Sequence, residues 1–338
     1  MKIKFAIVRI LRICQKWMNR IRFKFITIKR NGYSIYQFDA LAKDIPQSLF
    51  YTLDFEKNNS NLFYNHAGII KEYAGFNKKI QLPFAIEHSP YLNNYVWDVD
   101  INTDTFGIIT FSDYRCDVLS KATTKLVIPI GPYIHYAKSF LSIKEFEQEK
   151  KKLGKTLLVF PAHSTHFHGV SYDYQQDVNF LLKIGKDFDS ILVCLYWKDI
   201  IAGKANNYRN SRFKIVTAGH IFDPHFLNRL KTIIQLSDFT MSNSPGNHIG
   251  YCVHLNKPHY LYLMDTTIST LSNISKHWEE IDISEWGNSR DLVVENFSRF
   301  QNFIDPEQKK VVEYIWGTNH IKTKEEMFDI LNGKGMNG

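Results

Sequence analysis

Histidines gather in the second half of the sequence, and several of them follow short apolar runs. Eight of the thirteen histidines lie between positions 163 and 259: His163, His166, His168, His220, His225, His248, His254 and His259. Two of the segments are "FPAHSTHFHG" and "TAGHIFDPH". The first residues of "FPAHSTHFHG" are typical of the end of a buried strand. Neutral imidazoles at strand ends could donate hydrogen bonds to a phosphate or to sugar hydroxyls. The alternative is that these histidines are structural or lie on the surface.

The sequence does not predict a metal site. The spacing of His163, His166 and His168 is no established zinc motif, and no cysteine or carboxylate completes the set. The four cysteines, at positions 14, 116, 194 and 252, stand far apart. Their spacing favours reduced thiols in a cytoplasmic protein over a disulfide framework.

The stretch "SNSPGNHIGYCVHLNKP" (residues 242–258) predicts a strand end, a glycine-bearing turn and a short helix. In parallel sheets, ligands bind at such strand ends, and the free N–H groups of a helix start suit a phosphate. The alternative is an ordinary tight turn. The predicted phosphate ligands are Ser242, Asn243, Gly246, Asn247 and His248, with His163, Ser164 and Thr165 across from them.

Two further segments could take part in group transfer. "AIEHSPY" places Glu87 and His88 at another strand end, where either could act as a general base; Glu87 could instead pair with a nearby cation. Lys198 in "LYWKDI" could contact a base or ribose, or stand at an ordinary capped helix start.

The elements that would position these residues follow a strand–helix–strand rhythm. Strands are predicted in "LPFAIEHSP", "TFGIITFS" and "KLVIPIG", and a helix follows over residues 142–154. The rhythm then restarts with "KTLLVFPAHS" and continues through "SILVCLYW", "FKIVTAG", "DFTMSNS" and "PHYLYLM". This order predicts an α/β protein with two Rossmann-like lobes.

The first thirty residues carry ten lysines and arginines and no carboxylate, which is more than the whole net charge of +8. A nucleic-acid partner is not expected, because its groove would spread cations over the folded body. Residues 1–20 have the spacing of a basic amphipathic helix, which favours an anionic membrane surface. The alternative is a helix docked on the body with a solvated basic face. "IRFKFITIKR" (residues 21–30) alternates like a strand, and "DFEKNNSNLFYN" (residues 54–65) has the composition of a loop.

The order "SDFTMSNSPGNHIGYCVHLNKPHYL" resembles the donor-binding segment of GT-B glycosyltransferases. "IEHSP", "VIPIGPYIHYA" and "KTLLVFPAHS" resemble parts of bacterial surface-polysaccharide (capsule, O-antigen or lipopolysaccharide) transferases of that class. The glutamate pair of the common retaining pattern is absent. The resemblance implies two lobes facing a central cleft: an acceptor-side lobe over residues 21–150 and a donor lobe with closing helices over residues 151–338.

It also implies metal-independent transfer of a sugar from a nucleotide-sugar, as substrate and without a cofactor, to a lipid-linked surface glycan or glycolipid. The enzyme would lie on the cytoplasmic face of the cell membrane. The alternatives are a nucleotide-sugar epimerase, a polyol-phosphate transferase, or a non-enzymatic membrane-associated assembly protein.

Overall fold

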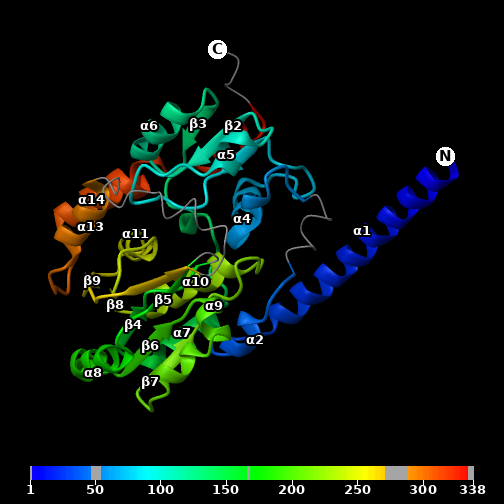
Figure 1. Ribbon diagram of the computed structural model, residues 1–338. Helices are drawn as coiled ribbons and strands as arrows, with labels where there is room; N and C mark the ends of the chain where they lie inside the picture. Colours follow the sequence, from blue (N-terminus) through cyan, green and yellow to red (C-terminus); the bar gives the residue numbers. More distant parts are fainter. Residues whose placement is uncertain (1, 47–54, 166–167, 271–287, 334–338) are drawn as a thin grey trace.

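Two separate parallel sheets form the body of the protein in a computed structural model, which describes residues 2–46, 55–165, 168–270 and 288–333 (Figure 1). The first sheet has the order β1-β2-β3 and the second the order β7-β6-β4-β8-β9. The predicted α/β class, with a Rossmann-like sheet in each half of the chain, is confirmed.

The first sheet is a βαβ unit with one strand added before it. Its strands are β1 (Phe84–Ile86), β2 (Gly107–Thr110) and β3 (Leu126–Pro129). Helix α6 (Asp113–Ala122) connects β2 to β3, and the Ser112 hydroxyl caps its first turn. All residues of β1 and β2 are buried, which explains why apolar runs rather than alternation mark these strands in the sequence.

The second sheet begins after helix α7 (Ile143–Leu153), which has a capping box at Ser142 and ends at Gly154. The helix predicted over residues 142–154 is therefore confirmed. The strands are β4 (Thr156–Phe160), β6 (Ser190–Cys194), β7 (Phe213–Val216), β8 (Phe239–Ser242) and β9 (His259–Leu261). The connecting helices are α8 (Tyr174–Ile184), η3 (Gly185–Asp187), α9 (Trp197–Ile201), η4 (Lys204–Tyr208), α10 (Phe226–Leu236) and α11 (His248–His254).

Shorter elements lie outside these two units. These elements are α2 (Phe38–Ala42), η1 (Asn59–Asn65), α4 (His66–Ala74), α5 (Asp98–Asn102), η2 (Tyr133–His135), η7 (Thr318–His320) and an antiparallel pair, β5 (His168–Ser171) with β10 (Thr267–Thr270). Because η1 is a 3-10 helix, the segment of residues 54–65, expected to be a loop, is not simply a loop in its described part.

The last helices contact both halves of the protein. They are α13 (Asn288–Phe297), α14 (Pro306–Trp316) and α15 (Lys324–Leu331). Helix α14 packs on α11 and on α6, and α15 packs on α4. A Cβ atom at Gly250 would lie 2.2 Å from the Trp316 ring, so glycine allows the close approach of α11 and α14. The sequence assigns residues 151–338 to the second lobe, and these helices also cover elements of the first.

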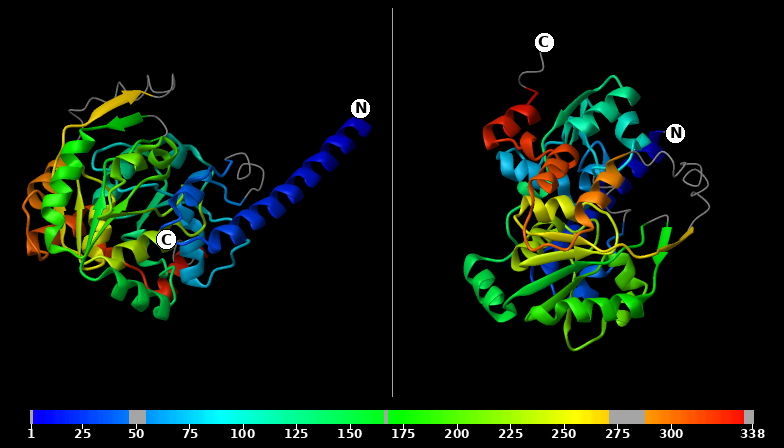
Figure 2. Two further views of the ribbon diagram at one scale, coloured as in Figure 1. Left: turned by 90° about the horizontal axis from the view of Figure 1, so that it is seen from below. Right: turned by 90° about the vertical axis from the view of Figure 1, so that its left-hand side faces the viewer.

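Helix α1 (Lys2–Asn31) extends away from the body (Figure 2). The strand expected over residues 21–30 is wrong, because helical apolar spacing continues through Ile21, Phe25 and Ile28 and glycine first appears at Gly32. Among the described residues, no helix is long and apolar enough to cross a membrane.

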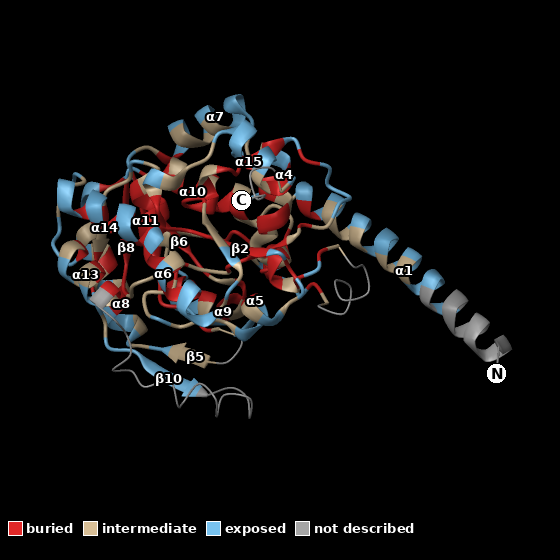
Figure 3. Cartoon of the chain, turned by 90° about the horizontal axis from the view of Figure 1, so that it is seen from above, coloured by how far each residue is buried: buried red, intermediate tan, exposed pale blue. Residues whose placement is uncertain are grey.

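The C-terminal end of α1 is held firmly. Phe23 and Ile26 pack against the core of the second sheet. Arg30 is buried and donates to the Leu41 carbonyl and to Asp223, each at 2.8 Å. The rest of the helix is largely exposed where its side chains are described (Figure 3).

Candidate functional site

Polar residues at the ends of β4 and β8 hold the loops that follow these strands. Asn243 Oδ1 accepts a hydrogen bond of 2.6 Å from the backbone N–H of Ala162. The Ser242 hydroxyl lies 3.0 Å from His259 Nε2. Ser242 and Asn243 are completely buried. Both predicted ligands therefore position the turn, while the side chains that follow them in the chain are more accessible.

The turn after β8 brings His248 beneath Gly246. The φ angle of Gly246 is not positive, so this glycine is not required by a left-handed backbone. A Cβ atom there would lie 2.8 Å from Cε1 of the His248 ring. The close approach of this ring, and not the backbone conformation, is therefore the reason why glycine fits here. The His248 ring stacks on Phe160 with centroids 4.7 Å apart.

His248 is uncharged at neutral pH. Burial, followed by the proximity of His259 and His163, holds the pKa of His248 well below its usual range. Its Nε2 is buried and has no hydrogen-bond partner among the described residues. A buried imidazole nitrogen without a partner is costly, and a polar group of a ligand would supply the missing bond.

Asn247 joins the two halves of the site. Its side-chain amide donates a hydrogen bond of 2.6 Å to the hydroxyl of Ser89. Ser89 follows β1 of the first sheet, whereas Asn247 lies between β8 and α11 of the second. The carboxyl ends of strands from both parallel sheets therefore meet at one place.

Glu87 is part of a buried ion pair. Arg115 donates to its Oε1 through Nε at 3.0 Å and Nη2 at 2.5 Å, and the Thr110 hydroxyl donates to Oε2. Arg115 also donates to the carbonyls of Asn93 and Tyr95. Burial raises the pKa of Glu87, and Arg115 opposes this rise. With both oxygens occupied, Glu87 holds Arg115 and, through it, the segment after β1.

His88, the next residue, is half-buried and faces other rings. Its ring stacks on Tyr64 with centroids 5.1 Å apart and lies 6.0 Å from the Trp97 ring.

Tyr64 and Asn65 have φ angles of 55° and 60°, which cost about 1–3 kcal/mol each for residues other than glycine. Such strain persists where surrounding contacts fix the backbone, and it gathers at functional sites.

The three predicted residues after β4 differ in their surroundings. His163 is exposed and its ring lies 4.6 Å from that of Tyr196. Ser164 is buried, and its N–H donates to Asp199 while Lys204 donates to its hydroxyl at 2.8 Å. Thr165 exchanges hydrogen bonds with the backbone of His168, the first residue of β5. Of the three, His163 is the one placed to meet a ligand, and the neighbouring His166 lies outside the described residues.

Lys198 lies in the first turn of α9, with its ammonium 5.4 Å from the centroid of the Trp197 ring. Burial lowers the pKa of Lys198, and the carboxylates of Asp199 and Asp44 oppose this shift. These contacts connect Lys198 with the segment near α2. Its predicted role toward a base or ribose stays a prediction.

Sequence reasoning missed three residues that border the site: Tyr64, His66 and Tyr196. Tyr64 and Tyr196 share a hydrogen bond across the two halves of the protein, and burial is the main cause that raises the pKa of Tyr196 to about 12. His66 is 1% exposed, and its Nδ1 has no hydrogen-bond partner among the described residues. Residues 54–65 carry no strand or helix pattern, so the sequence offered no signal for Tyr64.

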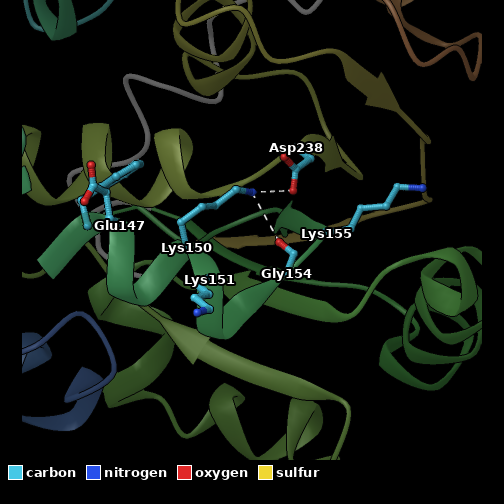
Figure 4. A pocket seen from close by; sticks show the side chains of 7 residues that line it. Glu147, Lys150, Lys151, Gly154, Lys155 and Asp238 are labelled. Atoms are coloured by element: carbon cyan, nitrogen blue, oxygen red, sulfur yellow. Dashed lines mark hydrogen bonds and ion pairs between the residues drawn. The ribbon is translucent and has the colours of Figure 1, made fainter. Parts of the chain in front are cut away.

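Two surface cavities are found in the described part of the protein, and one of them lies away from this place. One, of about 590 Å³, is lined by Lys150, Gly154, Lys155 and Asp238 among others, and Lys150 donates to Asp238 and to the Gly154 carbonyl (Figure 4). It borders the starts of β4 and β8, opposite the predicted site. A second, of about 380 Å³, lies beside Tyr260–Met264. No group of three or more potential metal ligands occurs among residues 2–46, 55–165, 168–270 and 288–333.

Comparison with known proteins gives similarities of fold alone. No family model and no curated protein matches the sequence. A structure of the wall teichoic acid polymerase TagF is 10% identical, with a TM-score of 0.43 over 94% of this chain and 98% of that one. MnaA of S. aureus with UDP is 11% identical, with a TM-score of 0.35 over 69% of each chain.

UDP-GlcNAc 2-epimerase of Neisseria meningitidis, bound to UDP-GlcNAc, is 14% identical, with a TM-score of 0.34 over 70% of this chain and 63% of that one. With all three TM-scores below 0.5, these similarities do not define a function for this chain.

Proposed function

We propose that the protein is a glycosyltransferase that uses a nucleotide-sugar donor. The observation that carries the proposal is the Asn247–Ser89 contact, which joins the carboxyl ends of strands from two parallel sheets. Each such edge is where a parallel sheet binds its ligand. A site between two of them can hold a donor on one side and an acceptor on the other.

The proposed donor side consists of Asn247, His248 and His163. The neutral imidazole of His248 and the amide of Asn247 can donate hydrogen bonds to the donor phosphate as negative charge develops on it. His248 fits this role because its buried Nε2 lacks a partner among the described residues. The proposed donor site needs no metal ion.

The proposed acceptor side begins at His88. The acceptor oxygen forms a bond to the anomeric carbon of the sugar, and the bond from that carbon to the phosphate oxygen breaks. The His88 imidazole takes the proton from the acceptor hydroxyl, and the nucleotide leaves with the electron pair of the broken bond. Glu87 is a positioning residue here, because it fixes the segment after β1 through Arg115.

We further propose that α1 attaches the enzyme to an anionic membrane surface, where a lipid-linked glycan would be the acceptor. Leu11, Cys14, Trp17, Met18, Ile21, Phe25 and Ile28 are exposed and fall within about 120° of the helix circumference. Trp17 is 65% exposed and Phe25 67%. The cations of α1 complement lipid phosphates.

Calorimetry of the full chain with UDP, GDP and CMP tests the donor site. At least one nucleotide is expected to bind, and Asn247→Ala is expected to weaken it about tenfold, the loss of one strong hydrogen bond. Asn228→Ala, which alters an exposed amide bonded to the Lys138 carbonyl, is the matched control. Binding of none of the three nucleotides, or equal binding by Asn247→Ala, would count against the proposal.

A further inference from the structure

Four rings, one of them the proposed catalytic base His88, form a cluster on the acceptor side. We define the ring cluster as Phe63, Tyr64, His88 and Trp97, all of which are half-buried. Phe63 stacks on Trp97 with centroids 5.9 Å apart and an interplanar angle of 16°. The Phe63 and His88 rings lie 5.2 Å apart at 78°. Beside these ring contacts, each of the four residues remains partly exposed.

The ring cluster is held from both halves of the protein. The N–H of Tyr64 donates to the Ile221 carbonyl, and the Asn65 amide donates to the Pro224 carbonyl, each at 2.7 Å. These carbonyls belong to the loop that follows β7 of the second sheet. The positive φ angles of Tyr64 and Asn65 are therefore imposed by contacts between the halves, which fixes the rings before any ligand arrives.

The phenol groups and the His66 imidazole around the ring cluster are uncharged at neutral pH. Burial raises the pKa of Tyr64 and of Tyr91 well above the usual range. Burial, followed by the proximity of His88, lowers the pKa of His66 well below its usual range. The Tyr64 and His66 ring centroids are 5.5 Å apart, and His66 Nδ1 has no hydrogen-bond partner in the described part of the chain. Phenol and imidazole groups can thus exchange hydrogen bonds with hydroxyls without charge.

The ionisable groups close to the ring cluster do not favour an anion. Arg115 lies 5.4 Å from the centroid of the Tyr91 ring, but Glu87 and two backbone carbonyls occupy its guanidinium. Asp100 is buried on the same side, and its Oδ1 accepts from the Ser60 hydroxyl at 3.0 Å. The carboxyl groups of Glu87 and Asp100 both lie close enough to Tyr91 to contribute to its raised pKa. A phosphate on the acceptor would meet two carboxyl groups and a cation that is already paired.

We propose that the ring cluster binds an uncharged sugar of the acceptor, by stacking of the sugar ring on Phe63 and Trp97 and hydrogen bonds from its hydroxyls to Tyr64 and His88. The inference rests on the proposed glycosyl transfer and selects a neutral glycan over a polyol-phosphate chain. Pockets lined by aromatic faces with a few placed polar groups suit such ligands.

Saturation-transfer NMR of the full chain tests this inference with methyl glucoside, methyl galactoside and methyl N-acetylglucosaminide as neutral probes and glycerol 3-phosphate as the anionic probe. The neutral glycosides are expected to bind and glycerol 3-phosphate is not. Trp97→Ala and Phe63→Leu are each expected to weaken glycoside binding about tenfold. Tyr314→Ala, at a 49% exposed ring, is the control and should leave it unchanged.

UDP, GDP and CMP binding, measured on the same samples, separates the two proposals and reports on folding. Retained nucleotide binding with lost glycoside binding in Trp97→Ala supports the ring cluster as the acceptor site. Glycoside binding that survives in both Trp97→Ala and Phe63→Leu overturns the inference, as does absence of glycoside binding in the parent protein or tight binding of glycerol 3-phosphate. Failure of all three nucleotides to bind the parent refutes the donor site instead.

Discussion

Gly246→Ala should disturb the candidate donor site without straining the backbone. The added Cβ atom would lie 2.8 Å from Cε1 and 3.0 Å from Nδ1 of His248, so the imidazole must move off Phe160. Loss of the ring stacking costs about 0.5–1.5 kcal/mol, and overpacking adds about 1–3 kcal/mol. The reduced entropy of the unfolded chain offsets about 0.4–1 kcal/mol. A net loss of about 0.5–4 kcal/mol in the free energy of unfolding follows from these terms.

Urea unfolding and nucleotide calorimetry check this result together. At a loss of this size most of the protein stays folded at room temperature, so affinity can be measured on both variants. Nucleotide affinity should fall, because His248 leaves its place beside the proposed donor phosphate. Gly32→Ala is the control, since its Cβ atom would lie 3.7 Å from the Lys29 carbonyl, an ordinary contact. Unchanged stability and unchanged affinity in Gly246→Ala would refute the view that Gly246 makes room for His248.

Three other outcomes are expected. Arg30→Gln should lower the free energy of unfolding by about 3–5 kcal/mol, because it breaks a buried ion pair with Asp223. The control Lys29→Gln, at the exposed neighbouring residue, should change the free energy of unfolding by less than about 0.5 kcal/mol. Equal thermal unfolding of the two variants would contradict this prediction. Burial lowers the pKa of His259 to about 3 in the folded protein, whereas an unfolded histidine has a pKa of about 6.5. As the pH falls below about 6.5, His259 is therefore protonated in the unfolded chain but not in the folded one, and the protein loses stability. Between pH 7 and 5 that loss is about 2 kcal/mol, and urea unfolding of His259→Asn should show a correspondingly flatter pH dependence. Deletion of residues 1–20 should abolish sedimentation with phosphatidylserine vesicles while nucleotide binding persists, and equal sedimentation of both forms would refute the membrane role of α1.

The strands were the most predictable part of the fold. Runs such as "GIIT" and "SILVC" are buried along their whole length, and uninterrupted burial is what an apolar run between polar ends encodes. The helix of residues 142–154 was equally clear, since a capping box and a C-terminal glycine mark both of its ends. The strand expected over residues 21–30 failed because "FKFIT" alternates over a few residues, while the helical spacing extends over all thirty residues of α1.

The candidate site was predictable only where it follows strands. Asn247 and His248 follow β8, and Glu87 and His88 follow β1, so their place at the sheet edges could be inferred from the topology rule. Whether a polar side chain already has a hydrogen-bond partner depends on residues that lie far from it in the sequence. Glu87 faces Arg115, 28 positions later. That pairing, which the sequence could raise only as an alternative, leaves His88 as the more accessible of the two candidate bases. Tyr64 could not be found, because its position depends on the Ile221 carbonyl, 157 positions further along the chain.

One loop of the second sheet connects α1 with the ring cluster. Asp223 pairs with Arg30 at the end of α1 and with Arg229 of α10, while the carbonyls of Ile221 and Pro224 accept hydrogen bonds from Tyr64 and Asn65. All four partners bind within a few residues of one another after β7. Because both ends of this connection are buried or strained, the direction of α1 and the position of the ring cluster are fixed by the same segment. A membrane-attached α1 would therefore hold the proposed acceptor site in a defined orientation to the lipid surface, as a lipid-linked acceptor requires.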